Sequence, residues 1–235
     1  MRNKNLLDIY TILTKKYKNL NWWPVDKKYH EKNKTDPRFE IITGAILTQN
    51  TAWSNVEKSL EKLKEKNKLD INSIIQSKPK ELSEMIRSSG FFNQKTDRLR
   101  EISMHISNKY NQDLDKFFSK DFKKLRTELL SLNGIGPETA DSILLYAGEK
   151  PVFVVDAYTK RLCQRLPIDV EIDYDSIQKH FEKELSKKYS GEELIEVYNQ
   201  FHAQIVIFAK EFCRKKPVCS NCPLSSICDY TNKLL

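Results

Sequence analysis

LNGIGPETADSILLYA, residues 132–147, is the stretch that decides the fold of this 235-residue chain. It overlaps two segments whose apolar residues recur every three or four positions, 121–132 and 138–148, which predicts two helices joined by a tight turn. Gly134 and Gly136 permit this turn, because glycine adopts positive φ without a steric penalty. The free N–H groups at the start of the second helix can then bind a phosphate, and a unit of this kind can hold a nucleic-acid backbone without contacting the bases. An ordinary helical corner with glycine caps is the alternative.

The same helical spacing continues outward along the chain. It predicts helices over 6–17, 39–50, 53–66, 79–89, 94–110, 157–166, 174–189 and 191–212. PVFVV (151–155) is the one β-like run, and it is too short and solitary to make a sheet, so we expect an extended connector or the entry to the next helix. The sequence therefore predicts an all-α fold.

The chain is long enough for one large domain or two small lobes. The polar stretch DKKYHEKNKTDP (26–37) is the best candidate for a linker between lobes. We expect one helical barrel lobe over 37–149, which contains the hairpin unit 121–148. The second lobe should combine 1–36 with 150–235.

Composition narrows the setting. The chain has 40 Lys and Arg against 32 Asp and Glu, a formal charge of +8, so a polyanion is a plausible partner. The sequence lacks an 18-residue apolar run and a signal-peptide pattern. We therefore expect a soluble intracellular protein of the cytoplasm or nucleoid, without membrane association, and a monomer.

Four cysteines near the C-terminus follow the pattern C-x5-C-x2-C-x5-C and predict a cofactor site. They are Cys213, Cys219, Cys222 and Cys228. A single C-x2-C flanked by two five-residue gaps favours a [4Fe–4S] cluster, with zinc or disulfides as alternatives. The first gap holds three basic residues that can meet phosphates, Arg214, Lys215 and Lys216. The remaining Cys163 reads as a small buried apolar residue.

Asp156 follows the apolar run and precedes the predicted helix 157–166, where it could serve merely as an N-cap. However, the hairpin, the string VVDAY (154–158) and the cysteine loop 213–228 together resemble the helix-hairpin-helix DNA glycosylase superfamily of the endonuclease III type. The resemblance spans roughly residues 37–230, although the first cysteine gap is one residue shorter than usual. It implies a [4Fe–4S] cluster on the four cysteines and double-stranded DNA with a damaged base as the partner.

The resemblance also implies roles for individual residues. Asp156 matches the carboxylate that stabilises an oxocarbenium-like sugar and orients the attacking water. Because the target base must leave the duplex, a side chain commonly fills the gap. By position Asn50 matches the gap-filling glutamine, with Gln49 beside it, although helix-end capping is the alternative for both. The remaining implied DNA contacts are the loop SGFFNQK (89–95) with Asn93, and Gly134, Gly136 and Thr139 of the hairpin.

One departure from the family pattern concerns the hairpin. Bifunctional members carry a lysine two residues after the second glycine, and it forms a Schiff base that permits strand cleavage. This chain has Glu138 there. We therefore expect a monofunctional glycosylase that leaves an abasic site, with Glu138 as a candidate catalytic or pocket residue. Glu138 can at the same time be a favourable acidic residue in a first helical turn.

The three tryptophans suggest the substrate. Tryptophan faces attract cations and suit a base that alkylation has made positive. The strings WWP, GAILTQNT, SGFFNQK, GIGPETADSILLYA, VVDAYTKRL and FHAQIV resemble the 3-methyladenine DNA glycosylase III branch, which also has glutamate at the lysine position and whose best-known form lacks the cysteine loop. That resemblance implies a base sandwich of Trp22 and Trp53, with Trp23, His202 and Lys210 near the pocket. The alternative is that these tryptophans are core residues.

The expected function is therefore excision of an alkylated purine, 3-methyladenine foremost, in a cleft between the lobes where Asp156 faces the aromatic pair. Removal of oxidised guanine, an oxidised pyrimidine or a mismatched pyrimidine is the alternative within the superfamily. A non-catalytic binder of DNA structure is the alternative from another class.

Overall fold

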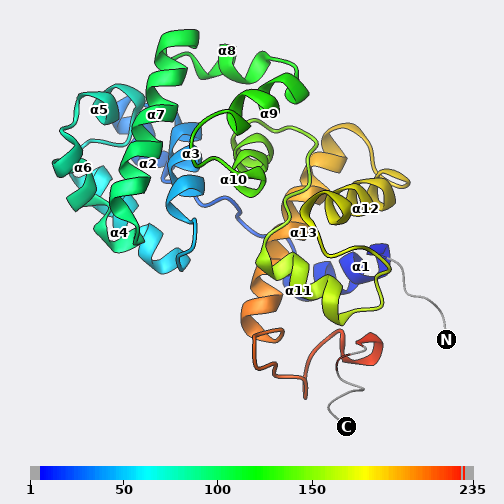
Figure 1. The fold of residues 1–235 in the computed structure, drawn as a ribbon. Helices are drawn as coiled ribbons and strands as arrows, with labels where there is room; N and C mark the ends of the chain where they lie inside the picture. Colours follow the sequence, from blue (N-terminus) through cyan, green and yellow to red (C-terminus); the bar gives the residue numbers. More distant parts are fainter. Residues whose placement is uncertain (1–5, 229, 231–235) are drawn as a thin grey trace. The chain divides into compact units, whose positions relative to one another are not determined.

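The protein is described here by a computed structural model covering residues 6–228 and 230, and its regular structure is helical (Figure 1). Over these residues no β-strand forms, so the predicted all-α fold is confirmed. The apolar run 151–155 before Asp156 lies outside the helices and forms a connector, the first of the two predicted alternatives. None of the helices in the described range is long and apolar enough to cross a membrane.

The chain divides into two compact units. One unit is Trp23–Glu149, and the other joins the residues up to Trp22 with those from Lys150 onward. The first boundary thus falls before the polar stretch 26–37 rather than at its end.

The prediction that 26–37 is a linker is wrong, because Lys27–Asn33 form helix α2. The Asp26 side chain accepts a hydrogen bond from the Tyr29 N–H and caps the helix. His30 is only 3% exposed, and its Nε2 lies 3.0 Å from Oε2 of the equally buried Glu40. Two polar residues therefore pair inside the unit, which a reading of polarity alone cannot reveal.

Helix α3 is the centre of the Trp23–Glu149 unit. It begins at Pro37 after the Asp36 cap and ends at Leu47, and every residue from Phe39 onward is buried. The elements that follow are α4 (Trp53–Glu65), α5 (Ile71–Gln76), α6 (Pro79–Met85), η1 (Arg87–Ser89), α7 (Phe92–Tyr110) and α8 (Leu114–Ser119). Helices α4 and α7 pack directly on α3.

The predicted hairpin forms from α9 (Phe122–Leu130) and α10 (Pro137–Ser142). The second predicted helix changes character part-way, since Ile143–Ala147 continue as a π-helical turn, η2. Arg126 on α9 makes a two-pronged contact with the fully buried Asp141 on α10, at 2.6 and 2.9 Å. This bidentate pair is a strong link between the two helices.

The other unit is built around α13 (Gly191–Glu211), which packs against α1 (Leu6–Tyr17), α11 (Ala157–Arg165) and α12 (Tyr174–Ser186). Two glutamines of α13 hold the chain that follows α1. The Gln204 amide donates to the Lys18 carbonyl at 3.0 Å, and Gln200 accepts from the Leu20 N–H at 2.7 Å. The N-terminal helix is therefore part of the same unit as the C-terminal third.

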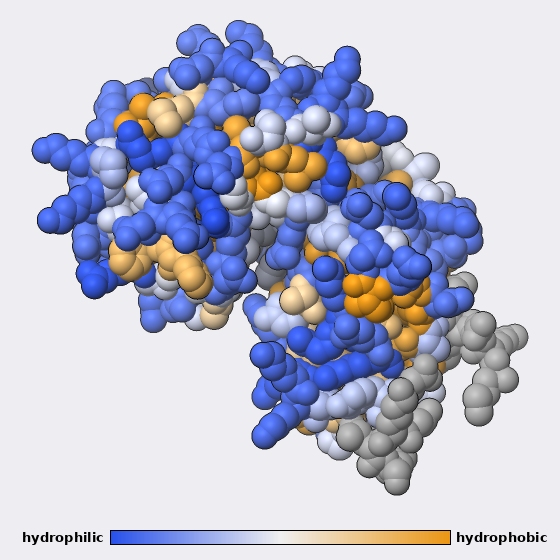
Figure 2. Space-filling model, in the orientation of Figure 1, coloured by the Kyte–Doolittle hydropathy of each residue, from blue (hydrophilic) through white to orange (hydrophobic). Residues whose placement is uncertain are grey.

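Figure 2 shows that the visible face of each unit is mostly hydrophilic, with small separate apolar patches. This agrees with a chain in which 31% of residues are charged. Only four large apolar residues of the described range are prominently exposed, namely Phe91, Met104, Ile172 and Val218. Of these, Phe91 is the most exposed, at 61%.

Candidate functional site

Asp156 is the N-cap of α11, and its carboxylate is buried. Its Oδ1 accepts hydrogen bonds from the backbone N–H and the hydroxyl of Thr159, at 2.7 and 2.9 Å. The other oxygen, Oδ2, lies 3.7 Å from His202 Nε2 on α13. Burial alone would raise the pKa of Asp156, but His202 and Thr159 outweigh it and hold that pKa below its usual value. The residue is thus a buried carboxylate that stays ionised.

The unit that holds Asp156 contains three of the other predicted pocket residues. His202 is 5% exposed, and its ring packs edge-on against Phe153. Lys210 lies two turns further along α13 and is exposed. Trp22 closes the N-terminal segment of this unit and is half-buried. His202 is the residue whose contact with Asp156 fixes the geometry of the carboxylate's second oxygen.

The hairpin turn is held by side chains from outside the hairpin. The Gln49 amide donates to the Gly134 carbonyl at 3.0 Å and to the Thr139 hydroxyl at 2.8 Å. Glu101 on α7 accepts from the Asn133 N–H at 2.9 Å. Gly134 has φ +74°, which explains glycine at this position. Gly136 is exposed and precedes the first turn of α10, as a phosphate contact requires.

The adjacent Gln49 and Asn50 differ in environment. The Gln49 side chain is engaged with the hairpin, whereas Asn50 is exposed and adopts φ +53° at the turn after α3. The left-handed conformation is tolerated by asparagine more readily than by most residues. Asn50 thus offers a side chain that a DNA gap could take up, and its gap-filling role stays a prediction.

The loop 89–95 is a sharp turn that leads into α7. Gly90 and Phe91 both have positive φ, +66° and +46°, and Asn93 is exposed in the first turn of the helix. The exposed ring of Phe91 stands at the tip of this turn. The predicted contact loop 89–95 includes Phe91, but only Asn93 was singled out in it, because the exposure of Phe91 has no signature in the sequence.

Glu138 occupies the first turn of α10 and is exposed. An acidic residue there is favourable next to the positive end of the helix dipole. Its position two residues after Gly136 is the one where the family's bifunctional members carry lysine.

An aromatic cluster forms in the Trp23–Glu149 unit. The Trp23 ring meets Trp53 edge to face, with centroids 5.2 Å apart, and lies 5.3 Å from Tyr146 of η2. A Cβ on Gly44 would come within 3.0 Å of the Trp23 indole, so the glycine allows this ring to lie close to α3. Tyr146 was missed because it reads as one more apolar residue of a buried run.

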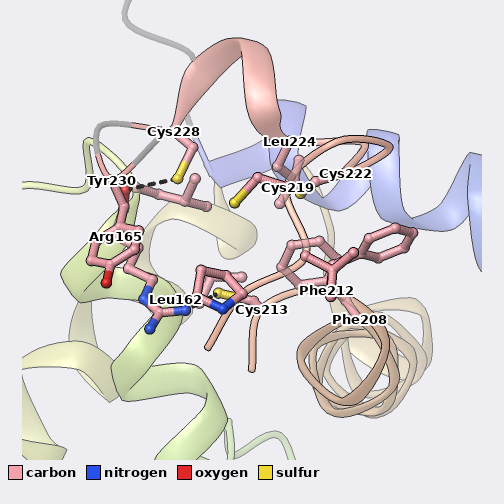
Figure 3. A pocket seen from close by; sticks show the side chains of 13 residues that line it. Leu162, Arg165, Phe208, Phe212, Cys213, Cys219, Cys222, Leu224, Cys228 and Tyr230 are labelled. Carbon is pink, nitrogen blue, oxygen red and sulfur yellow. Dashed lines mark hydrogen bonds between the residues drawn. The ribbon is translucent and has the colours of Figure 1, made fainter. Parts of the chain in front are cut away.

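The four cysteines of the C-terminal loop line one pocket, and Figure 3 shows their sulfur atoms around it. All are free thiols. The walls include Leu162, Leu166, Phe208, Phe212 and Leu224. Burial raises the pKa of the Cys222 thiol to about 11, and the three neighbouring cysteines act in the same direction. Within residues 6–228 and 230, no three His, Cys, Asp or Glu side chains form a ready-made site for a metal ion.

Two arginines of α11 bind the start of the cysteine loop. Arg161 donates to the Cys213 carbonyl at 2.7 Å. Arg165 donates to Cys213 Sγ at 3.2 Å and to the Arg214 carbonyl at 2.7 Å. The side chains of Arg214, Lys215 and Lys216 are exposed, as a contact with phosphates requires. The helix that Asp156 caps is therefore also the support of the cysteine loop.

Comparison with known families gives one match over most of the chain. Residues 43–187 match the model described as HhH-GPD superfamily base excision DNA repair protein. The matched region includes the hairpin, Trp53 and Tyr146 of the aromatic cluster, and Asp156.

Individual relatives are similar to this chain over more of its length than the family model. A protein of Methanocaldococcus jannaschii, provisionally named a DNA repair glycosylase, is 44% identical over 94% of both chains. The endonuclease III of Thermotoga maritima is 27% identical over 87% of this chain and 88% of its own. The H. pylori 3-methyladenine DNA glycosylase, solved with 1,N6-ethenoadenine, superposes with a TM-score of 0.70 at 34% identity, covering 86% of this chain and 96% of that one.

Proposed function

Because the chain belongs to the HhH-GPD superfamily of base excision DNA repair proteins, and is a DNA glycosylase of that family, we propose that it excises an alkylated purine, foremost 3-methyladenine, without cleaving the strand. The observation that carries the proposal is Asp156, a buried carboxylate whose pKa is held below its usual value.

Asp156 would act on the sugar. Departure of the base leaves positive charge at C1′, which a nearby carboxylate stabilises. Thr159 fixes Oδ1, and His202 lies beside Oδ2. The oxygen beside His202 is then the one available to orient a water for attack. We propose His202 as a pocket residue, together with Lys210.

Glu138 supports the monofunctional part of the proposal. Strand cleavage through an imine needs an amine nucleophile at C1′, and a carboxylate cannot supply it. The expected product is an intact strand with an abasic site. Glu138 would remain near the DNA backbone, at the exposed start of α10.

Support for an alkylated purine comes from the aromatic residues. Trp23, Trp53 and Tyr146 gather in one cluster, and tryptophan faces attract a positively charged base with a contribution of about 0.5–2 kcal/mol. The 34% identical H. pylori relative is named for 3-methyladenine. We propose Trp53 and Trp22 as the residues that stack on the flipped base, with Trp23 near the pocket.

The protein surface proposed to bind damaged duplex DNA comprises the hairpin turn and two neighbouring turns. Gly134, Gly136 and Thr139 would hold the backbone of the lesion strand, with Gln49 bracing the turn and Asn50 filling the gap. Asn93 would contact the duplex from the loop 89–95. We propose that the protein acts inside the cell as a monomer.

We further propose that Cys213, Cys219, Cys222 and Cys228 hold a [4Fe–4S] cluster. The fit rests on four thiols around one pocket with an apolar wall and an arginine donor at Cys213. When bound, such a cluster supplies a rigid iron–sulfur core that shapes the basic loop 214–216. The neighbouring arginines Arg161 and Arg165 orient the loop from α11.

The decisive experiment is a release assay on methylated duplex DNA. Wild-type protein should release 3-methyladenine, and Asp156→Asn should lose release while keeping DNA binding, because asparagine also caps helices well. Asp173→Asn is the matched control, since Asp173 caps α12 in the same way and lies in the same unit. Release that survives in Asp156→Asn would refute the assignment.

Two further assays separate the alternatives. Borohydride should trap no covalent complex with DNA, and a trapped band would overturn the monofunctional assignment. A panel of duplexes with oxidised guanine, oxidised pyrimidines and mismatched pyrimidines tests the other lesions. Protein that binds duplex but releases no base from any of them would be a DNA-structure binder.

A further inference from the structure

Lys95 is a buried cation with an unusual pair of partners. It is 0% exposed, and its Nζ donates to the Leu47 carbonyl at 2.8 Å and to the Ser89 carbonyl at 2.6 Å. Leu47 ends α3, so its carbonyl is one of those that a helix end leaves for other donors. Ser89 ends η1. One ammonium group thus joins the chain just before Gln49 to the chain just before Phe91.

Burying an ammonium group is unfavourable unless hydrogen bonds replace the lost water. Both acceptors here are neutral carbonyls, and burial together with the charge of Arg98 lowers the pKa of Lys95 to about 8. An apolar side chain of similar length would avoid this desolvation. What the lysine adds is a pair of charge-assisted hydrogen bonds that fix two backbone positions.

Arg98 extends the same arrangement one turn further along α7. Its Nη1 donates to Gln49 Oε1 at 2.5 Å, and the Gln49 amide in turn donates to the Gly134 carbonyl. The Arg98 side chain also fills the space beside Gly134, where a Cβ would lie 2.1 Å from its Nε. The hairpin turn is thereby linked to the start of α7.

Three turns of the Trp23–Glu149 unit therefore meet at α7: 48–52, 87–91 and 133–136. The tips of the first two are exposed residues in left-handed conformations, Asn50 at φ +53° and Phe91 at φ +46°. Such conformations persist where surrounding contacts fix them. Serines add to this at the second turn, since Ser88 donates to the Asn55 carbonyl of α4 at 3.1 Å.

We propose that Lys95 and Arg98 are positioning residues that set the spacing of these three turns, so that Asn50, Phe91 and the hairpin engage the duplex together. The inference rests on the proposed function, in that the three turns are taken as the DNA-binding surface. It goes beyond it by assigning the geometry of that surface to two side chains that need not touch DNA.

The test compares Lys95→Met with Lys64→Met. Lys64 is a matched control in the same unit, because its side chain is only 19% exposed and it pairs with Asp26 and Glu40 at 3.3 and 3.4 Å. The probe is a duplex with a stable abasic analogue opposite 2-aminopurine, whose fluorescence rises when the base unstacks. Affinity, fluorescence and urea unfolding are measured on all proteins.

Lys95→Met should weaken the affinity for the duplex about tenfold and reduce the fluorescence rise. The reason is that the two turns lose the charge-assisted hydrogen bonds that fix their positions. Lys64→Met should lose stability but keep affinity and fluorescence. If both variants lose stability and neither changes the DNA readouts, Lys95 is merely structural and the inference is overturned. Wild-type protein that does not bind the duplex would instead overturn the proposed function.

Arg98→Met provides a second route if Lys95→Met does not fold, because Arg98 is only partly buried. It should reduce affinity and the fluorescence rise in the same direction. Unchanged DNA readouts in a folded Arg98→Met protein would overturn the inference on their own.

Discussion

The hairpin turn and the cysteine loop are both irregular segments beside a short helix, yet they are stabilised in opposite ways. The hairpin turn is held by protein groups: Gln49, Glu101 and the Arg126–Asp141 pair. The cysteine loop is held at its start by arginines, but its centre is a pocket lined by four thiols. The first segment is held by contacts between protein groups, whereas the second is the segment proposed to hold a [4Fe–4S] cluster.

This difference predicts where each unit is vulnerable. Contacts within the hairpin are lost one at a time, by substitution or by titration of a side chain, and each contact contributes modestly. With the proposed cluster bound, the cysteine loop would gain its stability in one step, because such a site couples binding to folding. Losses should therefore be larger and more sudden in the loop.

The largest effect is expected for removal of one cysteine ligand. Cys222→Ser should abolish absorbance near 400 nm and destabilise the C-terminal loop by more than about 4 kcal/mol, since loss of a bound metal group is among the most damaging single changes. Limited proteolysis should then cut within 213–228 and leave the Trp23–Glu149 unit intact.

Cys163→Ala is the control for that experiment. Cys163 is 3% exposed and lies outside the cysteine pocket, and burial raises its pKa to about 12, as for an inert buried thiol. It should keep the absorbance. Colourless wild-type protein containing zinc would contradict the cluster.

The next largest effect concerns the hairpin itself. Gly134→Ala should cost roughly 2–3 kcal/mol, because alanine is strained at φ +74° and its Cβ would displace Arg98. Gly136→Ala is the matched control, since nothing lies within 4 Å of a Cβ there. Urea unfolding compares the two variants, and equal losses would show that the close approach of Arg98 is unimportant.

The sequence predicted the long helices well because amphipathic spacing is a local property. The short α5 and α8, and α2 with its buried His30–Glu40 pair, were missed, since six or seven residues carry too little periodicity. The end of the hairpin helix was predicted as α-helical, and its π-helical turn depends on packing rather than on residue type.

The parts of the candidate site that lie in sequence motifs could be predicted. Asp156 and the four cysteines stand out because their spacing is specific. Lys95 and Arg98 do not stand out in the sequence, because they lie in the polar stretch NQKTDR (93–98), which is typical of a surface. The two carbonyl groups that Lys95 contacts cannot be identified from the sequence. Tertiary contacts between distant turns are therefore what the sequence could not supply.

Acid should weaken the hairpin selectively through Glu128 on α9. Burial alone would raise the pKa of Glu128, but hydrogen bonds from Lys120, Tyr110 and His105 outweigh it and lower the pKa to about 2. A lowered pKa in the folded state contributes stability above the unfolded pKa near 4.5, which is lost as pH falls toward 2. The loss should be on the order of 1–2 kcal/mol by pH 3.

Glu128→Gln isolates that contribution. Its unfolding free energy should be lower than that of the wild type at pH 7, and the difference should shrink between pH 5 and pH 3. Glu84→Gln is the surface control, since Glu84 is half-exposed and pairs only across one helical turn with Arg87. A gap between wild type and Glu128→Gln that stays constant with pH would contradict the pKa shift.

The smallest effect is expected for Arg165, which joins α11 to the cysteine loop. Arg165→Met removes donors to Cys213 Sγ and to the Arg214 and Lys215 carbonyls, at 3.2, 2.7 and 3.2 Å. Stability should fall by only about 1 kcal/mol, because these bonds lie near solvent. Loss of the 400 nm absorbance in air should nevertheless accelerate about tenfold, as donors around metal ligands tune the site they surround. Lys160→Met, on the same helix, removes an equal charge but none of these donors. If the 400 nm absorbance is lost at the same rate in both variants, the effect of Arg165 comes from its positive charge and not from its hydrogen bonds.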